Sequence, residues 1–320
     1  MKLNFDFEKY EKEQSKEQSL EETVVKDKET KEEKTKEKSK KKPKKEKKKK
    51  ESSREEKDTK AKIKDLSKLQ IILGVVFALT IALVGFFTFK LFSFRKEYKE
   101  GKKIYEGALE YVTENEGYEY TADVVTGPYN IDFVSLQAEN ADICAWIVIP
   151  DTVVNYPVLY SHDNKDYLRT TYTGEKNICG SIFMDCENIS DFSSANTILY
   201  GHNMHNGTMF RVLNDYSNED YYKEHPYVWI CTPTKQTKYN IIATYRTTAA
   251  GDTYNKDFII GSSQYKEWLS SLVEKSYYKC ADYDEQKPTI TLSTCVYHNS
   301  DKRMIVLLQE SEESILLNNY

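Results

Sequence analysis

The residues with the clearest chemical potential lie near the C-terminus, where a cysteine and an arginine stand at the facing ends of two strand-like runs. Cys295 ends the run 288–295 (PTITLSTC), and Arg303 begins the run 303–309. The residues between them are rich in turn formers, so the two runs predict a β-hairpin. A hairpin brings the thiol and the guanidinium side by side. A cation beside a thiol favours the nucleophilic thiolate, and a fixed arginine can stabilise an oxyanion that develops on a substrate carbonyl.

A cysteine nucleophile needs a partner that moves protons, and histidine suits this task because its pKa lies near neutrality. The chain has five histidines. Only His202 directly follows a strand-like run and its turn, in the segment 197–203, where Gly201 would let the backbone turn sharply. A side chain at that position would be presented at the rim of a barrel. His202 is therefore a candidate acid/base, but a lone histidine is more often structural, and its position alone does not assign the role.

Eight short apolar runs bounded by turns predict a mainly β domain, either a closed barrel or a sandwich. They are 145–149, 153–160, 179–184, 197–200, 227–231, 239–245, 289–294 and 304–309. One helix is expected among them, at 262–275, with four apolar residues on one face at helical spacing. We expect these four to pack on the barrel and not to bind a ligand: Tyr265, Trp268, Leu269 and Leu272.

The chain joins a basic tail to an acidic body. Residues 1–68 contain 25 Lys and Arg and 18 Asp and Glu, although the net charge of the whole chain is −5. The tail has few apolar residues, so it is expected to be disordered. Ten lysines lie between residues 38 and 50. We expect them to be solvated and to help orient the protein; a contact with membrane lipid is the favoured functional alternative, ahead of nucleic acid.

Residues 71–89 form a run without a charged residue, and its length matches a membrane-spanning helix. It is too far from the N-terminus for a cleavable signal peptide, and no small-residue cleavage site follows it. Lys and Arg flank both ends, and the lysine block favours a cytoplasmic N-terminus and an extracellular body. The prediction is a single-pass protein of the cell membrane. Its parts would be a cytoplasmic tail (1–68), a transmembrane helix (69–92), a helical stalk with N-terminal helices (93–142) and a β-barrel catalytic domain (143–320).

Three motifs resemble those of the sortases, and of class B in particular, in order and spacing. They are 199–204 (LYGHNM), 206–210 (NGTMF) and 292–295 (LSTC), the last with Arg303 eight residues on. The segments 140–146, 155–158 and 179–183 are similar to class B as well, so the resemblance covers about residues 130–310. It implies an eight-stranded sortase-type β-barrel with N-terminal helices and a long helix between the sixth and seventh strands.

The resemblance also implies a mechanism. Cys295 would attack the carbonyl of a Thr in a C-terminal sorting motif of an exported protein, commonly of the Asn- or Ser-Pro-x-Thr type, and form a thioester. His202 would protonate the departing amine and then accept a proton from an incoming amine, while Arg303 would hold the substrate and the oxyanion. The acceptor would be a peptidoglycan precursor or a pilin Lys. Thiolate and imidazolium would coexist in few molecules at neutral pH, which predicts slow turnover. No cofactor is implied.

Five further residues are candidates for lining the substrate groove, carried over from class B: Ser293, Thr294, Asn155, Leu159 and Tyr254. The chain departs from common class B patterns in its five additional cysteines and in the short loop after Cys295. Two of those cysteines, Cys144 and Cys231, lie inside apolar runs and are predicted to be small buried residues.

Three alternatives remain open. His202, His205, Cys295 and His298 have a spacing plausible for tetrahedral zinc, although Arg303 would oppose a cation. A cysteine protease would share the nucleophile but release its product to water. A membrane-anchored scaffold with a β-barrel ectodomain would not need Cys295 at all.

Overall fold

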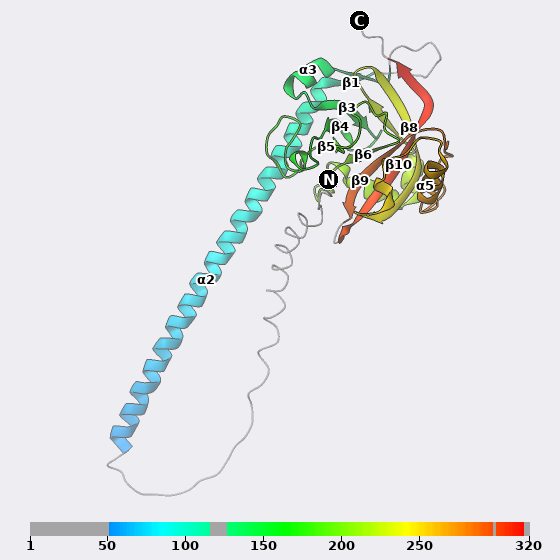
Figure 1. Ribbon diagram of the computed structural model, residues 1–320. Coiled ribbons are helices and arrows are strands. Elements are labelled where there is room, and N and C mark those ends of the chain that lie inside the picture. The colour runs from blue at the N-terminus through cyan, green and yellow to red at the C-terminus, as the bar shows by residue number, and fades with distance from the viewer. Residues whose placement is uncertain (1–50, 116–126, 297–298, 317–320) are drawn as a thin grey trace. The chain divides into compact units, whose positions relative to one another are not determined.

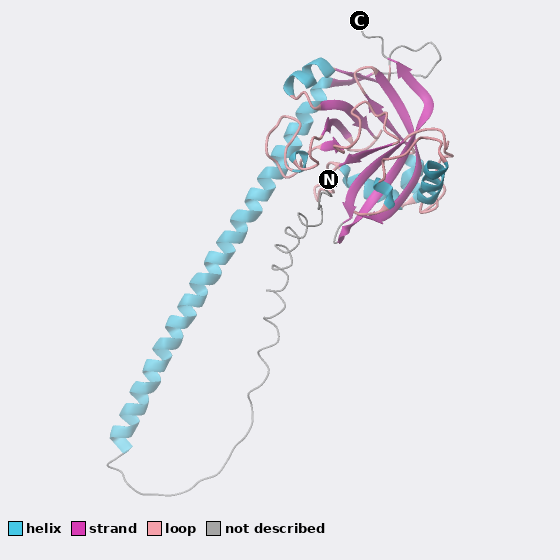
Figure 2. Ribbon diagram, viewed as in Figure 1, coloured by secondary structure: helices cyan, strands magenta, loops and turns pink. Residues whose placement is uncertain are grey.

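The computed structural model describes residues 51–115, 127–296 and 299–316, and the chain divides near residue 97 into two compact units that are described separately (Figure 1). The C-terminal unit is a β-barrel. Its eight strands close in the order β10-β8-β7-β3-β4-β5-β6-β9. The strands are drawn in magenta in Figure 2. The strands are β3 (Ile143–Val148), β4 (Asn155–Tyr160), β5 (Ile182–Met184), β6 (Asn196–Tyr200), β7 (Tyr227–Cys231), β8 (Lys235–Thr248), β9 (Thr289–Val296) and β10 (Asn299–Leu316). All eight predicted strands are confirmed, and the fold is a closed barrel, not a sandwich.

Two parallel pairings set the geometry of the barrel rim. β6 pairs parallel with β9, and β4 pairs parallel with β5, whereas the other neighbours are antiparallel. Because β6 and β9 run in the same direction, their C-terminal ends lie side by side. The segments that follow these two strands therefore share one end of the barrel.

The predicted helix is confirmed as α5 (Ser263–Val273), which lies between β8 and β9, the sixth and seventh barrel strands. The Ser262 side chain caps it by accepting the backbone N–H of Tyr265, and the four predicted side chains are buried. They form a second apolar cluster with residues of β8 and β10 on the outside of the barrel. Along β10, Ile305 and Leu307 belong to this outer cluster, whereas Met304, Val306 and Leu308 belong to the main core. One face of β10 thus lies under α5 and the other inside the barrel.

Shorter elements connect the strands. They are η2 (Asp166–Leu168), η3 (Phe210–Ser217), α4 (Glu219–Glu224) and η4 (Asp252–Tyr254). Of these, η3 follows the loop after β6, η2 lies between β4 and β5, and η4 lies in the connection between β8 and α5. Two of them bring a side chain to the end of β9: η3 carries Asn214, and η4 ends at Tyr254.

The N-terminal region differs from the prediction in two places. Helix α2 (Glu51–Ala108) begins inside the range 1–68 that was expected to be disordered, and residues 1–50 lie outside the described part of the chain. Residues 51–68 are rich in Lys and Glu, which have high helix propensity, and this explains the helix. The region 93–142 was expected to be helical. It contains η1 (Leu109–Tyr111), the paired strands β1 (Val112–Glu114) and β2 (Tyr129–Ile131), and α3 (Phe133–Glu139). β-Branched and aromatic residues explain the strand pair.

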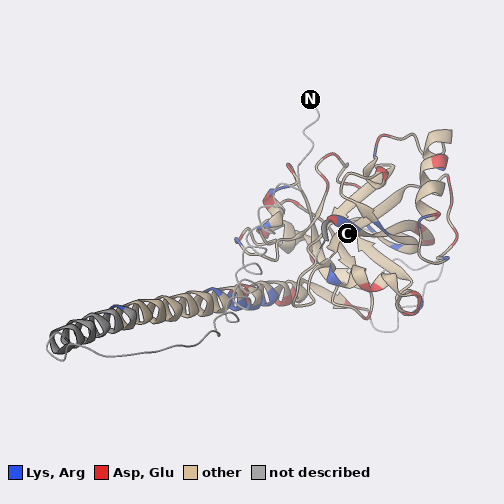
Figure 3. Cartoon of the chain, turned by 90° about the horizontal axis from the view of Figure 1, so that it is seen from below, with Lys and Arg blue, Asp and Glu red and all other residues tan. Residues whose placement is uncertain are grey.

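One helix among the described residues is long and apolar enough to cross a membrane; it lies within 70–111 and reaches a mean hydropathy of 2.6. Large apolar side chains along it are exposed, from Ile71 to Phe94. Its uncharged stretch is drawn tan in Figure 3. The last turns of α2 belong to the barrel unit, where Ala108 is buried and the Tyr105 hydroxyl donates to the Gly180 carbonyl at 2.6 Å.

Candidate active site

Cys295 and Arg303 are direct partners in the β9–β10 ladder, which confirms the predicted hairpin. Register partners point to the same face of a sheet, so the thiol and the guanidinium lie side by side. Ser293, two residues before Cys295, pairs with Ile305. The side chains of these two pairs therefore share one face of the sheet, and α5 covers that face further along β10. The Cys295 residue is half-buried, whereas Arg303 is only 4% exposed. The arrangement combines a partly accessible thiol with a buried cation.

His202 follows β6 at the same end of the barrel. Its Nε2 lies 2.8 Å from the carbonyl oxygen of Leu168, to which it donates. Burial lowers the pKa of His202 below its ordinary value, and the nearby charges of Arg169 and Arg303 lower it further, against the opposing effect of the Leu168 hydrogen bond. Arg303, the ladder partner of Cys295, is thus also close enough to His202 to lower its pKa.

Gly201 was predicted to allow a sharp backbone turn, but the structure requires a glycine there because of close packing. Its backbone is not in the left-handed region. A Cβ at this position would lie 2.5 Å from Ile182 Cδ1 and 2.7 Å from the ring of Phe210. The glycine therefore permits close packing under His202, and its N–H donates to the Ser293 carbonyl at 3.2 Å.

Two asparagines hold the carbonyl of Cys295, and neither was predicted. Asn203 Nδ2 donates to this oxygen at 2.8 Å, and Asn214 Nδ2 donates to it at 3.3 Å. Asn203 directly follows His202, so one short segment carries the imidazole and also holds the strand end that bears the thiol. Asn203 lies in the motif 199–204, but the motif does not indicate that its side-chain amide binds the Cys295 carbonyl.

Two tyrosines lie over Ser293. The Tyr254 hydroxyl and Ser293 Oγ are hydrogen-bonded at 2.8 Å. The ring of Tyr200 stacks on that of Tyr254, with centroids 6.3 Å apart and planes inclined by 24°. Burial raises the pKa of Tyr254 to about 12, while Ser293 and Arg303 oppose the rise. Tyr200 was not predicted, although it precedes Gly201 in the same motif.

The other three candidates for the substrate groove lie elsewhere. Thr294 faces away from Cys295 and donates to the Gly201 carbonyl at 2.8 Å. Leu159 is fully buried in the main core. Asn155 accepts a hydrogen bond from the indole N–H of Trp146 at 2.6 Å. The structure thus brings Ser293 and Tyr254 together with the three predicted catalytic residues, and it gives Thr294, Leu159 and Asn155 contacts within the barrel.

The zinc alternative required four residues. Of these, His205 is exposed, and His298 lies outside the described residues. No cluster of metal-ligating side chains occurs in the described ranges on either side of residues 297–298. Burial raises the pKa of the five other thiols, to about 12 for Cys144 and Cys179 and to about 11 for Cys280. Cys295 is the cysteine whose ladder partner is a cation.

A thiol beside a guanidinium, with an imidazole at the neighbouring strand end, can form and break a covalent acyl intermediate. Known proteins share this architecture. The sortase domain model matches residues 147–310. Sortase B of Listeria monocytogenes is 32% identical over 224 residues, which cover 68% of this chain and 88% of the relative. Sortase B of Staphylococcus aureus is 34% identical over 178 residues, which cover 55% and 72%.

A solved structure agrees with these matches. Sortase B from B. anthracis is 30% identical and superimposes with a TM-score of 0.57 over 67% of this chain and 98% of that one. The domain model, the curated relatives and the solved structure point to one family. The chain belongs to the sortase family and, within it, to class B, whose members are cysteine transpeptidases.

Proposed function

We propose that the protein cleaves a C-terminal sorting motif of exported proteins after Thr, through a thioester on Cys295, and transfers the acyl group to an amine acceptor. The observation that carries the proposal is the ladder pairing of Cys295 with Arg303. It provides a nucleophile and an oxyanion donor on one face, at the barrel end where His202 also lies. Family membership alone would not assign these roles to these residues.

The first half-reaction forms the thioester. The Cys295 thiolate attacks the Thr carbonyl carbon, and the carbonyl oxygen becomes an oxyanion that the Arg303 guanidinium stabilises. The C–N bond then breaks, and the departing nitrogen takes the proton of the His202 imidazolium. The products are an amine, a neutral imidazole and an acyl group bound to the sulfur. Because the pKa of His202 is lowered, few free molecules hold the imidazolium at neutral pH, and turnover is expected to be slow.

The second half-reaction resolves the thioester. An acceptor amine attacks the carbonyl carbon, neutral His202 takes the amine proton, and the C–S bond breaks to regenerate the thiolate and the imidazolium. One solved sortase B, 33% identical and with a TM-score of 0.53, is complexed with triglycine, a peptide with a free amine. This supports an amine acceptor, which we assign to a peptidoglycan precursor or a pilin Lys.

The groove for the peptide lies beside Ser293 and Tyr254 in this proposal. These two side chains contact each other directly, and Ser293 shares the face of Cys295. Thr294, Leu159 and Asn155 act less directly, because each has a contact inside the barrel. A substrate in extended conformation would place the carbonyl of its Thr next to Arg303.

The apolar helix supports a proposal for the protein's location. We propose that residues 69–92 cross the cell membrane once, with the tail 1–68 in the cytoplasm and the barrel domain 143–320 outside, joined by 93–142. The lysines at 38–50 support this orientation and could contact anionic lipid. Exported proteins would pass the catalytic domain in this arrangement.

The test incubates the full-length chain with a library of Asn- or Ser-Pro-x-Thr peptides, with and without triglycine. We expect the ligated peptide when triglycine is present and slow hydrolysis when it is absent. Hydrolysis alone in both cases would favour a plain protease. Stoichiometric zinc in the purified protein would contradict the thiol mechanism, and full function of Cys295→Ala in a cell would favour the scaffold.

A further inference from the structure

One carboxylate outside the catalytic residues binds several groups at once. Asp185 directly follows β5, and its side chain is 5% exposed. Its Oδ1 lies 2.9 Å from Lys256 Nζ and accepts the Glu187 backbone N–H at 2.9 Å. Its Oδ2 accepts the Tyr200 hydroxyl at 2.9 Å and the Asn164 side-chain amide at 3.1 Å. The carboxylate is thus satisfied on both oxygens by groups from separate segments of the chain.

Lys256 is the charged partner of this carboxylate. Its side chain is 16% exposed, and it also lies 2.7 Å from Glu187 Oε2. Burial lowers the pKa of Lys256, but the Glu187 and Asp185 carboxylates outweigh this effect and raise it overall. The Glu187 side chain is 70% exposed, so Asp185 is the buried member of the set. Removal of one partner from a buried ion pair leaves the other charge uncompensated and is strongly destabilising.

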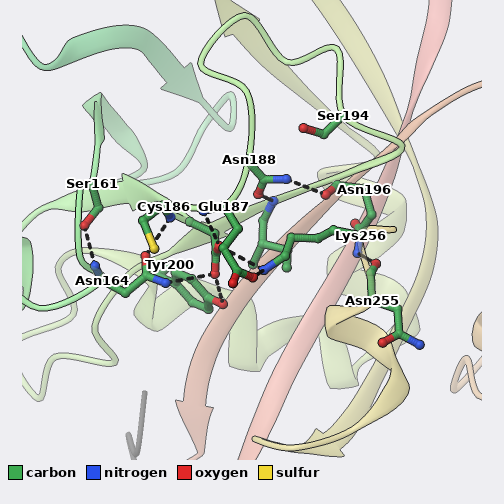
Figure 4. Close-up of polar contacts among 12 residues, drawn as sticks. Ser161, Asn164, Cys186, Glu187, Asn188, Ser194, Asn196, Tyr200, Asn255 and Lys256 are labelled. Atoms are coloured by element: carbon green, nitrogen blue, oxygen red, sulfur yellow. Dashed lines mark hydrogen bonds and ion pairs between the residues drawn. The ribbon is translucent and has the colours of Figure 1, made fainter. Parts of the chain in front are cut away.

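Lys256 lies in the connection between β8 and α5 that also carries Tyr254. A second contact holds this connection just before Lys256: Asn196 Nδ2 donates to the carbonyls of Thr253 at 2.9 Å and of Asn255 at 3.0 Å. Asn196 and Lys256 are labelled close together in Figure 4. Buried polar contacts therefore fix the chain immediately around Tyr254.

Asp185 accordingly holds both members of a ring pair. It binds Tyr200 directly through the hydroxyl, and it holds the segment of Tyr254 through Lys256. The two rings stack, and Tyr254 continues the chain of contacts to Ser293, two residues before Cys295. The pair comes from segments far apart in the chain. One shared carboxylate therefore joins the Tyr200 hydroxyl to the connection that carries Tyr254.

We propose that Asp185, together with Lys256, is a positioning residue that fixes the Tyr200–Tyr254 ring pair as one wall of the peptide groove. The inference rests on the proposed function, because it assumes that an extended sorting peptide binds beside Ser293. A wall that is already ordered avoids the entropy cost of ordering side chains and a loop on binding. Loss of Asp185 should therefore weaken peptide binding and leave the reactivity of the thiol unchanged.

The experiment compares Asp185→Ala, Asp185→Asn and the control Lys266→Met in the full-length chain in detergent micelles. Lys266 of α5 pairs with Glu285 at 3.3 Å, but both side chains are exposed, at 39% and 42%. We measure kcat and KM for the peptide that the wild type cleaves best, the rate of Cys295 alkylation by iodoacetamide, and amide hydrogen exchange in residues 249–262.

We expect Asp185→Ala to raise KM about tenfold while kcat and the alkylation rate change less than about twofold. Exchange in 249–262 should accelerate. Asp185→Asn should fold even if the alanine variant does not, and it should raise KM less, because its side-chain oxygen can still accept the Tyr200 hydroxyl. Lys266→Met should match the wild type. Combination of Asp185→Ala with Tyr200→Phe should raise KM by less than the product of the single effects.

An unchanged KM in both Asp185 variants would overturn the inference, and so would an equal loss of kcat and alkylation. If the wild type cleaved none of the peptides, the proposed function would fail separately. The hydrogen-exchange comparison would then decide whether Asp185 fixes the connection that carries Tyr254: unchanged exchange in 249–262 would overturn the inference in that case as well.

Discussion

Two cysteines stand near the C-terminal ends of barrel strands, and their surroundings differ sharply. Cys231 ends β7, where it pairs with Trp146 and Gln236 and is fully buried. Burial raises the pKa of its thiol well above the ordinary value. Cys295 lies near the end of β9, where it is half-buried and pairs with Arg303. The ladder partner and the access to solvent therefore separate the proposed nucleophile from a packing residue, although each thiol lies near the C-terminal end of its strand.

The contrast has a physical basis in the cost of a buried charge. A thiolate at Cys231 would be fully buried between uncharged ladder partners, so burial keeps this thiol neutral. At Cys295, the guanidinium of Arg303 lies on the same face of the ladder. If the pairing with Arg303 makes Cys295 reactive, substitutions at Cys295 and at Cys231 should have very different effects on activity.

The largest effect is expected from removal of the two thiols in turn. Cys295→Ala should reduce kcat/KM for peptide cleavage by about three orders of magnitude or more, because the covalent route is lost. Cys231→Ala should retain full activity and lose about 1 kcal/mol of unfolding free energy, as expected for a small cavity. Peptide kinetics and denaturant unfolding of both variants measure this. Comparable activity losses would remove the distinction between the two cysteines.

The next effect concerns the cation. Arg303→Lys retains the positive charge but loses the planar guanidinium, so we expect kcat/KM to fall about a hundredfold. The rate of Cys295 alkylation should fall much less, because a charge near the thiol remains. Parallel measurement of cleavage and alkylation separates the two roles of the residue. Full cleavage activity in the lysine variant would mean that Arg303 does not bind the oxyanion.

A smaller effect is expected from the amides that hold the Cys295 carbonyl. Asn203→Ala should lower kcat about tenfold, since the strand end beside His202 loses its shorter hydrogen bond. Asn214→Ala removes the longer bond, at 3.3 Å, and should have a weaker effect. Steady-state kinetics at saturating peptide gives the comparison. The reverse order of the two effects would contradict the assigned positioning role of Asn203.

The smallest effect concerns pH. Because the pKa of His202 is lowered in the folded protein, the unfolded chain binds more protons below the ordinary histidine pKa. His202 therefore contributes stability above that pKa, and this contribution declines as the pH falls toward the folded pKa. His202→Gln should lose less stability than the wild type between about pH 7.5 and 5.5, the range around the ordinary histidine pKa. Unfolding curves at both pH values test the sign, and an equal loss in both proteins would refute the lowered pKa.

The strands, helix α5 and the hairpin that pairs Cys295 with Arg303 could be predicted because their signals are local. Short apolar runs bounded by turns marked the strands, and the turn formers between Cys295 and Arg303 indicated the hairpin. The tertiary contacts could not be predicted. Asn214 reaches the Cys295 carbonyl from η3, and Asp185 reaches Tyr200 from the end of the neighbouring strand. Gly201 was correctly singled out for the wrong reason, since the close approach of Phe210 depends on packing that the sequence does not display.

The most direct test of the central claim is the intact mass of the full-length chain after brief incubation with a cleavable sorting peptide. We predict an adduct equal to the acyl fragment that ends in Thr, located by peptide mapping on Cys295 and released by hydroxylamine. Cys231 and the other four cysteines should remain unmodified. Peptide cleavage without any adduct on Cys295, or an adduct on another cysteine, would contradict the account.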